Sequence, residues 1–445
     1  MKGFALEPVP LKYRKGAYAI TSVWWGWIWF IGGPIYGVLD TAGWPFWTAV
    51  LLLFAANWIL AFVNMAIGLI GSRQGTTVAN TSRYAFGNIG TYIPSVIYFI
   101  TLAGWFGVSV GILAGVMGTD IGYLPIWAWA LVMGVIMAAL AIIGMWLITW
   151  LANWAVPVMF VLMMVGTGLA VTQSAGGIGA VFSGTVPGAQ VSIPLSIGLT
   201  VAFWIVGASL APDIARWAKG DNVVKVSSLS AFGISNPFIM ILGLISAIAI
   251  GNSNLFEAMP NFGSGTWWGP IWFWLAIIAI MLIVWTSGDC QLYTSGLSLS
   301  NMIRKPAHIS TTIAAVLGVG LAVAGIENNM LGWLTILGYF VPAITGILIA
   351  DYFFVHRSRY PHPKDIKKWI NPVAIVTYAI CVFVEWYLQV YMNDLGVPVL
   401  NSLILSIVLY TVLMKVTGWL NWDKSAAEFR SYPPGWPKVP AEKET

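Results

Sequence analysis

The positively charged residues of this chain fall in short clusters that long apolar stretches separate. Most gaps hold about two membrane-spanning lengths of roughly 20 residues, and the gap from Arg83 to Arg216 holds about four. The turns inside the gaps carry acids and no Lys or Arg, namely Asp40, Asp120, Glu257, Glu327 and Asp394. This is the positive-inside pattern. It predicts an even number of spans, about 12, with both termini in the cytoplasm.

Composition indicates a multi-pass protein of the inner or plasma membrane, because 59% of the residues are hydrophobic, 8% are charged and the mean hydropathy is +0.82. A soluble core cannot hide that much apolar surface. The net charge of +5 fits loops that face anionic lipid and does not imply a nucleic-acid partner. Cys290 and Cys381 both lie in apolar stretches, so neither a disulfide framework nor a metal site is expected.

The apolar stretches divide the chain into a short N-terminal segment, two sets of five spans, two further spans and a polar tail. We expect spans at about 17–38, 46–71, 92–117, 125–149, 153–172, 192–214, 227–250, 270–299, 309–325, 330–355, 370–393 and 397–420. The corresponding regions are a cytoplasmic segment 1–16, a first repeat 17–172, an outer loop 173–191, a second repeat 192–355, a cytoplasmic loop 356–369, two helices in 370–420 and a cytoplasmic tail 421–445.

Two of these spans are interrupted at comparable depths. The first carries Gly26 and then Gly32-Gly33-Pro34, and the sixth carries Gly207-Ala208-Ser209 and then Pro212. Backbone groups freed at membrane depth survive only where they face protein, water or a ligand. Interrupted spans five apart predict an inverted repeat with a substrate and ion site between the breaks. Packing glycines and ordinary kinks are the alternative explanation.

The eighth span places Thr286 and Ser287 side by side in an apolar run. Their hydroxyls, the carbonyl of Ile283 and carbonyls freed near Gly26 could hold a small cation, most simply sodium. The alternative is that both hydroxyls bond back to their own helix.

Three acids are candidates for coupling or gating. Asp289 lies deep in the eighth span, where a carboxylate is costly, so it is a candidate for ion or proton coupling. The alternative is that it caps a broken helix or pairs with a backbone N–H. Asp213, three residues before Arg216 on one helix face, and Asp351 lie near cytoplasmic ends, which favours a structural or gating role.

Two tryptophans lie too deep in their spans for an interfacial belt. Trp105 is flanked by Gly104 and Gly107, and Trp204 lies in the sixth span. An indole at this depth can stack on a flat heterocycle, although a mid-helix Trp more often packs against its neighbours. No nucleophile, base and acid set occurs, so we expect no enzyme.

The chain also resembles a known family. The matching motifs are Arg14-Lys15-Gly16, Arg83 with Phe86-Gly87, Gly104-Trp105-Phe106-Gly107-Val108, Asp213 with Arg216-Trp217, Trp285-Thr286-Ser287 with Asp289 and Tyr293, Ser295-Gly296-Leu297, Gly332-Trp333-Leu334-Thr335, and Ile349-Ala350-Asp351-Tyr352 with Arg359-Tyr360. In this order they resemble the nucleobase cation symport family one, most closely its cytosine permease branch.

The resemblance implies twelve spans, five-plus-five inverted repeats and alternating access. It implies a sodium site made by carbonyls of Gly26, Trp29 or Phe30, and Ile283 with the hydroxyls of Thr286 and Ser287. The aromatic sandwich of the family maps to Trp105 and Trp204. Polar contacts of the cytosine permeases are replaced by Leu102, Val206 and Ile283, so Thr101, Ser109, Ser209 or backbone groups near Gly207 would take over.

These observations predict a sodium-coupled secondary transporter that imports a nucleobase or related flat heterocycle and acts as a monomer or weak homo-oligomer without a cofactor. Two alternatives remain: a proton-coupled carrier that uses Asp289, and a transporter-like sensor or scaffold that binds a ligand without moving it.

Overall fold

The computed structural model describes residues 4–252, 254–361, 366, 369–391 and 397–419, and within these ranges every regular element is a helix. Nine of the described helices are long and apolar enough to cross a membrane, and Ile193–Ser209 and Ala307–Val323 are shorter apolar helices. Together with the interrupted first span, they are consistent with the twelve spans predicted. The predicted all-helical membrane fold is confirmed, and the predicted tail 421–445 lies outside the described residues.

The helices that make up the spans form one bundle, with connecting elements at its two ends. The helices of the bundle are α1 (Ala17–Ile28), α2 (Gly33–Asp40), α3 (Phe46–Gln74), α5 (Tyr92–Val116), α6 (Ile126–Ile143), α7 (Met145–Thr172), α9 (Ile193–Ser209), α10 (Ala211–Ala215), α11 (Asp221–Ser230), α12 (Asn236–Ile250), α14 (Gly269–Ile303), α15 (Ala307–Val323), α16 (Met330–Ile349), α17 (Pro372–Tyr391) and α18 (Pro398–Trp419). The shorter elements are α4 (Val78–Phe86), α8 (Gly177–Ser183), α13 (Leu255–Ala258), the 3₁₀ turns η1 (Leu11–Tyr13), η4 (Met259–Asn261) and η5 (Ile326–Asn329), and the π-helical segments η2 (Met117–Ile121), η3 (Ala231–Ser235) and η6 (Ala350–Val355).

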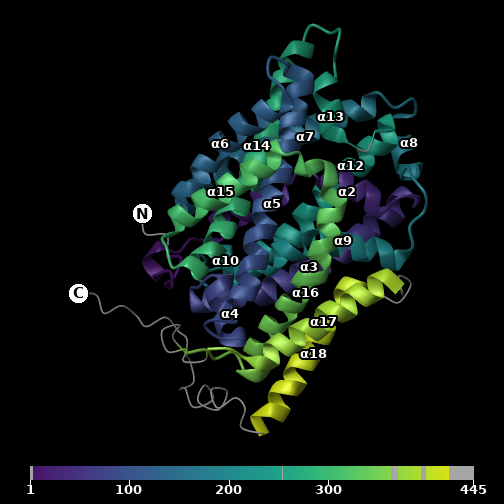
Figure 1. Ribbon diagram of the computed structural model, residues 1–445. Coiled ribbons are helices and arrows are strands. Elements are labelled where there is room, and N and C mark those ends of the chain that lie inside the picture. The colour runs from purple at the N-terminus through teal and green to yellow at the C-terminus, as the bar shows by residue number, and fades with distance from the viewer. Residues whose placement is uncertain (1–3, 253, 362–365, 367–368, 392–396, 420–445) are drawn as a thin grey trace.

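Packing places α14 and α5 against each other inside the bundle, with α15, α7 and α1 also packed on α14. The C-terminal helices α17 and α18, yellow in Figure 1, lie side by side along α16 at one edge of the molecule. Helix α14 therefore touches most of the elements that could form an internal site.

The first span is interrupted where the sequence predicts. Helix α1 ends at Ile28, and α2 begins at Gly33 with Pro34 in its first turn, where the missing N–H of proline costs nothing. Between them the Phe30 N–H turns back to the Ile28 carbonyl at 2.7 Å, so it does not reach Gly26. The carbonyl oxygen of Gly26 is thereby released from the helix ladder.

The sixth span breaks more mildly. Helix α9 ends at Ser209 and α10 begins at Ala211, with Leu210 between them and Pro212 in the first turn of α10. The Asn64 side chain of α3 donates to the Ala208 carbonyl at 3.4 Å, so a neighbouring helix supplies the hydrogen bond that the break weakens.

One predicted boundary is wrong. The fourth and fifth spans are predicted to meet near residues 150–152, but α6 ends at Ile143 and α7 begins at Met145. Gly144 separates them with φ of +100°, a conformation that residues with a side chain rarely adopt. In the sequence this glycine is embedded in an unbroken apolar run, which hides the turn. Within the predicted outer loop 173–191, residues Gly177–Ser183 form the short helix α8.

Helix α2 packs closely on α12 because glycines allow their backbones to approach. A Cβ atom built on Gly243 would lie 2.2 Å from the Pro34 carbonyl oxygen, and one on Gly37 would lie 2.6 Å from the Met240 carbonyl oxygen. Backbone atoms cannot swing aside as side chains do, so this contact fixes the position of α2.

We predict that Gly243→Ala lowers the free energy of unfolding of the purified protein by about 1–3 kcal/mol, the usual cost of overpacking, and therefore lowers its melting temperature. Gly320→Ala is the matched control, because a Cβ there meets no atom within 4 Å. Equal melting temperatures for the two variants would contradict the close α2–α12 contact.

Candidate functional site

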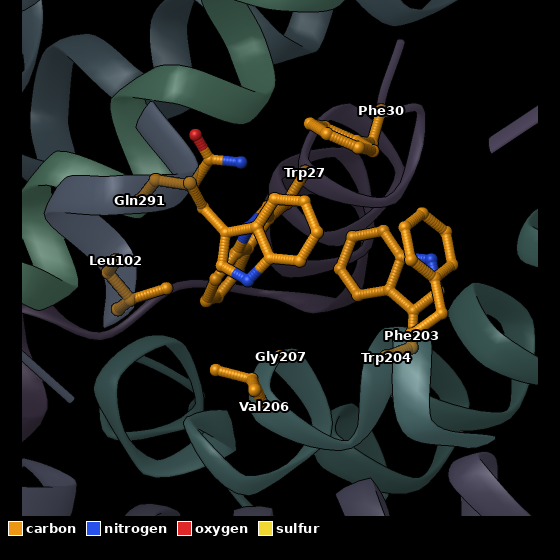
Figure 2. Close-up of a pocket in the computed structure, with 9 residues that line it drawn as sticks. Trp27, Phe30, Leu102, Phe203, Trp204, Val206, Gly207 and Gln291 are labelled. Atoms are coloured by element: carbon orange, nitrogen blue, oxygen red, sulfur yellow. The ribbon is translucent and has the colours of Figure 1, made fainter. Parts of the chain in front are cut away.

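A small pocket lies beside the break in the first span, between α1, α5, α9 and α14. Its walls are mostly aromatic and apolar, as Figure 2 shows. It is lined by Trp27, Phe30, Leu102, Trp105, Phe203, Trp204, Val206, Gly207 and Gln291. The predicted residues Trp105, Trp204, Leu102, Val206 and Gly207 thus come together around one cavity.

The aromatic rings of the pocket meet edge to face. Trp105 contacts Phe30 with ring centroids 5.5 Å apart at 85°, and Phe203 at 6.1 Å and 77°. Tyr36 of α2 stacks on the other side of Phe203 at 4.1 Å. In the predicted sandwich a planar base lies between Trp105 and Trp204, and both line this pocket. Among the described ring contacts, Trp204 contacts Phe203 and Phe232.

The pocket is narrow in this conformation. Its cavity volume is about 30 Å³, which is room for about two water molecules at ~10–15 Å³ each. An apolar cavity that binds benzene measures ~150 Å³. A flat ring can therefore enter only if the aromatic walls, Phe30 and Trp105 among them, move apart.

Gln291 of α14 brings a polar group to this apolar pocket, and the sequence analysis missed it. The Ser109 hydroxyl donates to its Oε1 at 3.1 Å and also lies 2.8 Å from the Trp105 carbonyl oxygen. The amide nitrogen makes no hydrogen bond within the described part of the chain, and Gln291 lines the pocket together with Trp27 (Figure 2). Ser109 thus orients Gln291 so that an N–H donor faces the pocket.

The other predicted contacts lie behind the pocket wall. Ser109 acts through Gln291, and the Ser209 hydroxyl donates to the Val206 carbonyl at 2.7 Å. Ile283 is fully buried and does not line the pocket. Trp27 and Phe203, which do line it, were missed because nothing but their neighbours, Gly26 and Trp204, points to them in the sequence.

A second cluster, made of oxygen atoms, joins α1 to α14 next to the pocket. The Thr286 hydroxyl oxygen lies 2.9 Å from the Gly26 carbonyl oxygen, 2.9 Å from that of Leu282 and 3.3 Å from that of Ile283. Hard oxygen ligands of this kind suit a small cation without redox chemistry. The predicted pairing of Gly26 with Thr286 and Ile283 is present in space.

The remaining predicted ligands are placed less directly. The Ser287 hydroxyl donates to the Val284 carbonyl of its own helix at 3.2 Å, and the Phe30 carbonyl accepts from the Gly33 N–H at 2.8 Å. Trp29 lies in the break, and its indole N–H donates to Ser235 at 2.8 Å. This bond and the one from Trp25 to Ser230 hold α1 against α11 and η3.

Asp289 lies one turn after Thr286 on α14 and is completely buried. Neither carboxylate oxygen has a hydrogen-bonding partner among the described residues. The helices packed on this part of α14, namely α1, α5, α6, α7 and α15, contain no Asp, Glu, Lys or Arg. The carboxyl group therefore has no fixed counter-charge on these neighbours.

Asp213 and Arg216 lie where the N-terminal segment crosses α10, away from the pocket. The Asp213 carboxylate accepts from the Val78 N–H at 2.8 Å, and Arg216 donates to the Tyr293 hydroxyl at 2.6 Å and to the Phe4 carbonyl. Arg14 donates to the Ser72 carbonyl at 2.7 Å. Burial, reinforced by the positive charge of Arg216, lowers the pKa of Arg14 to about 10. These contacts close the end of the bundle assigned to the cytoplasm.

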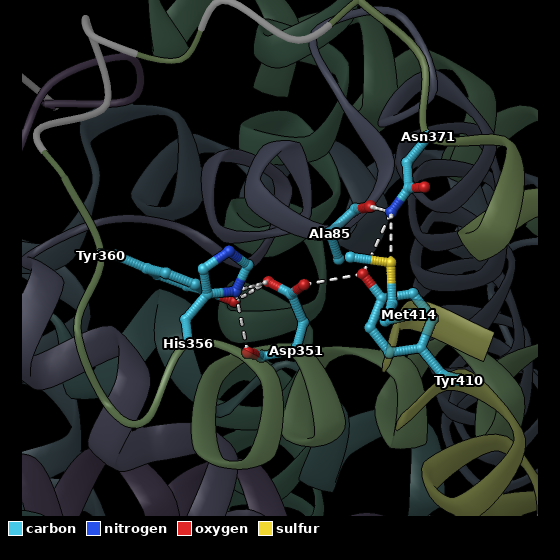
Figure 3. A network of polar contacts seen from close by, with 7 residues as sticks. All are labelled: Ala85, Asp351, His356, Tyr360, Asn371, Tyr410 and Met414. Carbon is cyan, nitrogen blue, oxygen red and sulfur yellow. Dashed lines mark hydrogen bonds and ion pairs between the residues drawn. The ribbon is translucent and has the colours of Figure 1, made fainter. Parts of the chain in front are cut away.

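Asp351 forms a separate buried network, shown in Figure 3. Its carboxylate accepts from the hydroxyls of Tyr360 and of Tyr410, the latter at 2.7 Å, and lies 3.2 Å from Nδ1 of His356. Asn371 donates to Tyr410 and to the Ala85 carbonyl. The network ties the end of α16 to α18 and α4, so Asp351 does not touch the pocket.

Comparison with known proteins places these features in a family. Residues 8–403 match the family described as permease for cytosine/purines, uracil, thiamine, allantoin. The cytosine permease of Escherichia coli (strain K12) is 28% identical over 425 residues, which cover 95% of this chain and 96% of the permease.

Solved structures share the fold. Mhp1, a nucleobase-cation-symport-1 family transporter, in a closed conformation with bromovinylhydantoin bound, superposes with a TM-score of 0.81 at 19% identity, covering 96% of this chain and 99% of Mhp1. A Na⁺-coupled sialic acid symporter in a substrate-bound outward-open state superposes with a TM-score of 0.67 at 11% identity, covering 91% and 90% of the two chains.

Proposed function

Because the chain belongs to the family of permeases for cytosine/purines, uracil, thiamine and allantoin, we propose that it imports a flat nucleobase-like heterocycle together with sodium by alternating access. The observation that carries this proposal is the joint between Gly26 and Thr286, which lies next to the aromatic pocket. One pair of helices, α1 and α14, contributes to both sites.

The pocket favours a flat ring with few polar groups on its edge. Trp105 offers an indole face, and Leu102 and Val206 replace polar contacts that the resemblance to cytosine permeases would lead one to expect. The Gln291 amide N–H can donate to a ring carbonyl or ring nitrogen. The substrate is then a heterocycle that needs one strong acceptor and gains most of its affinity from stacking and burial.

Sodium couples to the substrate through α1. A cation held between the Gly26 carbonyl and the Thr286 hydroxyl fixes α1 against α14, and Gly26 directly precedes Trp27 in the pocket wall. Sodium and substrate therefore stabilise the same arrangement, and each raises the affinity for the other. Sodium and substrate are released when the contacts of Asp213 and Arg216 at the cytoplasmic end break. The network of Asp351 keeps the end of α16 attached to α18 during this change.

We predict that Thr286→Ala weakens sodium binding and sodium-dependent substrate binding by about 10- to 100-fold, because the hydroxyl ligand is lost at a buried site. Ser287→Ala should act in the same direction. The measurement is thermal stabilisation by substrate, with sodium or choline as the cation.

Thr149→Ala is the matched control, since the Thr149 hydroxyl is also buried but donates to the Met145 carbonyl within α7 at 2.6 Å. Unchanged sodium dependence in both Thr286→Ala and Ser287→Ala would exclude the ion site. Uptake into vesicles driven by a pH gradient without sodium would select a proton-coupled carrier, and binding without accumulation would select a sensor.

We predict that Trp105→Ala abolishes measurable substrate binding while the protein still folds, because the ring face that holds the ligand is removed. Trp146→Ala, at a position where the indole is 53% exposed on the outside of α7, is the control and should bind normally. Substrate affinity retained in Trp105→Ala would rule out stacking in this pocket.

We predict that Gln291→Leu weakens substrate binding by about 10- to 100-fold, the cost of leaving a buried polar group of the ligand unpaired, and leaves sodium binding without substrate unchanged. Gln389→Leu on α17 is the control, because Gln389 contacts Glu385 and lies outside the pocket. Isothermal titration with a nucleobase and hydantoin panel tests both variants; equal affinities would remove Gln291 from the site.

A further inference from the structure

A larger cavity lies at the end of the bundle that the charge pattern assigns to the cytoplasm, where α5 begins and α14 ends. It has a volume of about 530 Å³. It is lined by Asn88, Ile89, Tyr92, Arg304, Ile366 and Trp369. None of these residues lines the substrate pocket or takes part in the ion site, so this cavity has no role in the transport mechanism above.

Backbone contacts build the walls of this cavity. The Asn88 side chain donates to the Ile366 carbonyl at 2.8 Å, and the Ile89 N–H donates to the Trp369 carbonyl at 2.8 Å. Gly87 permits the close approach, because a Cβ there would lie 2.6 Å from the Trp369 carbonyl oxygen and its φ is +91°. The segment around Trp369 is therefore attached to the turn that precedes α5.

Arg304 supplies a positive charge without a matching acid. It forms no ion pair or side-chain hydrogen bond with any described residue, and none of the described residues that line the cavity is an acid. Partial burial lowers the pKa of its guanidinium. The residue ends α14 with φ of +56°, and its N–H bonds to the Ser300 carbonyl at 3.0 Å. Glycine is the usual residue at such a left-handed helix end, so a strained arginine here points to a use for its side chain.

Other groups at the cavity also suit an anion. The Tyr92 hydroxyl forms no hydrogen bond among the described residues and can donate to an oxygen ligand. Tyr92 is the first residue of α5, so the positive end of that helix dipole adds to the charge of Arg304. A guanidinium, a phenol and a helix start together match a phosphate group.

The rim of the cavity is apolar and exposed. Trp369 is 71% exposed, Ile370 47% and Ile89 40%. A free phosphate ion would use the cation and leave this rim in water. A phospholipid uses both, with its headgroup on Arg304 and its acyl chains along the rim, at the interface where tryptophan is favoured.

We propose that this cavity binds the headgroup of an anionic phospholipid from the cytoplasmic leaflet. Basic pockets at the ends of membrane helices recognise such headgroups through charge and hydrogen bonds. The bound lipid would connect the end of α14 to the start of α5 and to the segment at Trp369. It stabilises the protein without entering the transport path.

The experiment measures the melting temperature of the purified full chain in detergent with added phosphatidylglycerol, phosphatidylcholine or inorganic phosphate. Phosphatidylglycerol should raise the melting temperature of the wild type more than phosphatidylcholine does, and phosphate alone should not raise it. Arg304→Gln should weaken the effect of phosphatidylglycerol about fivefold in lipid concentration, as expected for one surface arginine. Lys305→Gln, which removes the adjacent cation outside the cavity lining, is the matched control and should respond as the wild type does.

Arg304→Gly separates the side chain from the backbone strain. Glycine accepts the positive φ, so this variant should fold and melt without lipid at least as high as the wild type, yet lose the response to phosphatidylglycerol. An equal loss in Lys305→Gln would reduce the effect to general surface charge. Stabilisation by phosphate alone would make the cavity a free-anion site, and a full lipid response in Arg304→Gly would overturn the proposal.

Discussion

A polar backbone group inside a membrane must find a partner, and this requirement shapes the centre of the molecule. At the break after Ile28 the Phe30 N–H donates to the Ile28 carbonyl, so the Gly26 carbonyl loses the donor that a continuous helix would provide. Lipid hydrocarbon provides no hydrogen-bond donor for that oxygen, and the Thr286 hydroxyl of α14 contacts it at 2.9 Å. The break in the sixth span meets the same demand through Asn64. Each interruption thus forces a contact with another helix.

These contacts link the oxygen cluster to the aromatic pocket with few polar residues. Gly26 and Thr286 join α1 to α14. The same two helices line the pocket through Trp27, which follows Gly26, and through Gln291, five residues after Thr286. A change in the α1–α14 joint therefore alters the pocket wall directly. The close contact between α2 and α12 at Gly243 fixes the position of α2, the second half of the broken span. A movement of α1, the first half, would therefore occur relative to α2.

The sequence predicts the parts of this arrangement that depend on local chemistry. Gly and Pro in the first span predict its break, and Thr286 in an apolar run indicates the oxygen cluster. Gln291 was missed because its role depends on Ser109, 182 residues away. The turn at Gly144 was missed because backbone angles leave no trace in an apolar run. The rings that contact Trp105 in the structure, Phe30 and Phe203, are decided by tertiary packing.

The narrow pocket has a consequence for the leakage of ions across the membrane. A membrane that stores an ion gradient loses it through any water-filled path, because ions cross with their hydration shells. A cavity of about 30 Å³ admits about two waters, so this pocket by itself offers an ion no wide aqueous path. With the aromatic rings in this position the pocket is a barrier beside the broken helix, and a flat solute enters it only after the rings have moved apart.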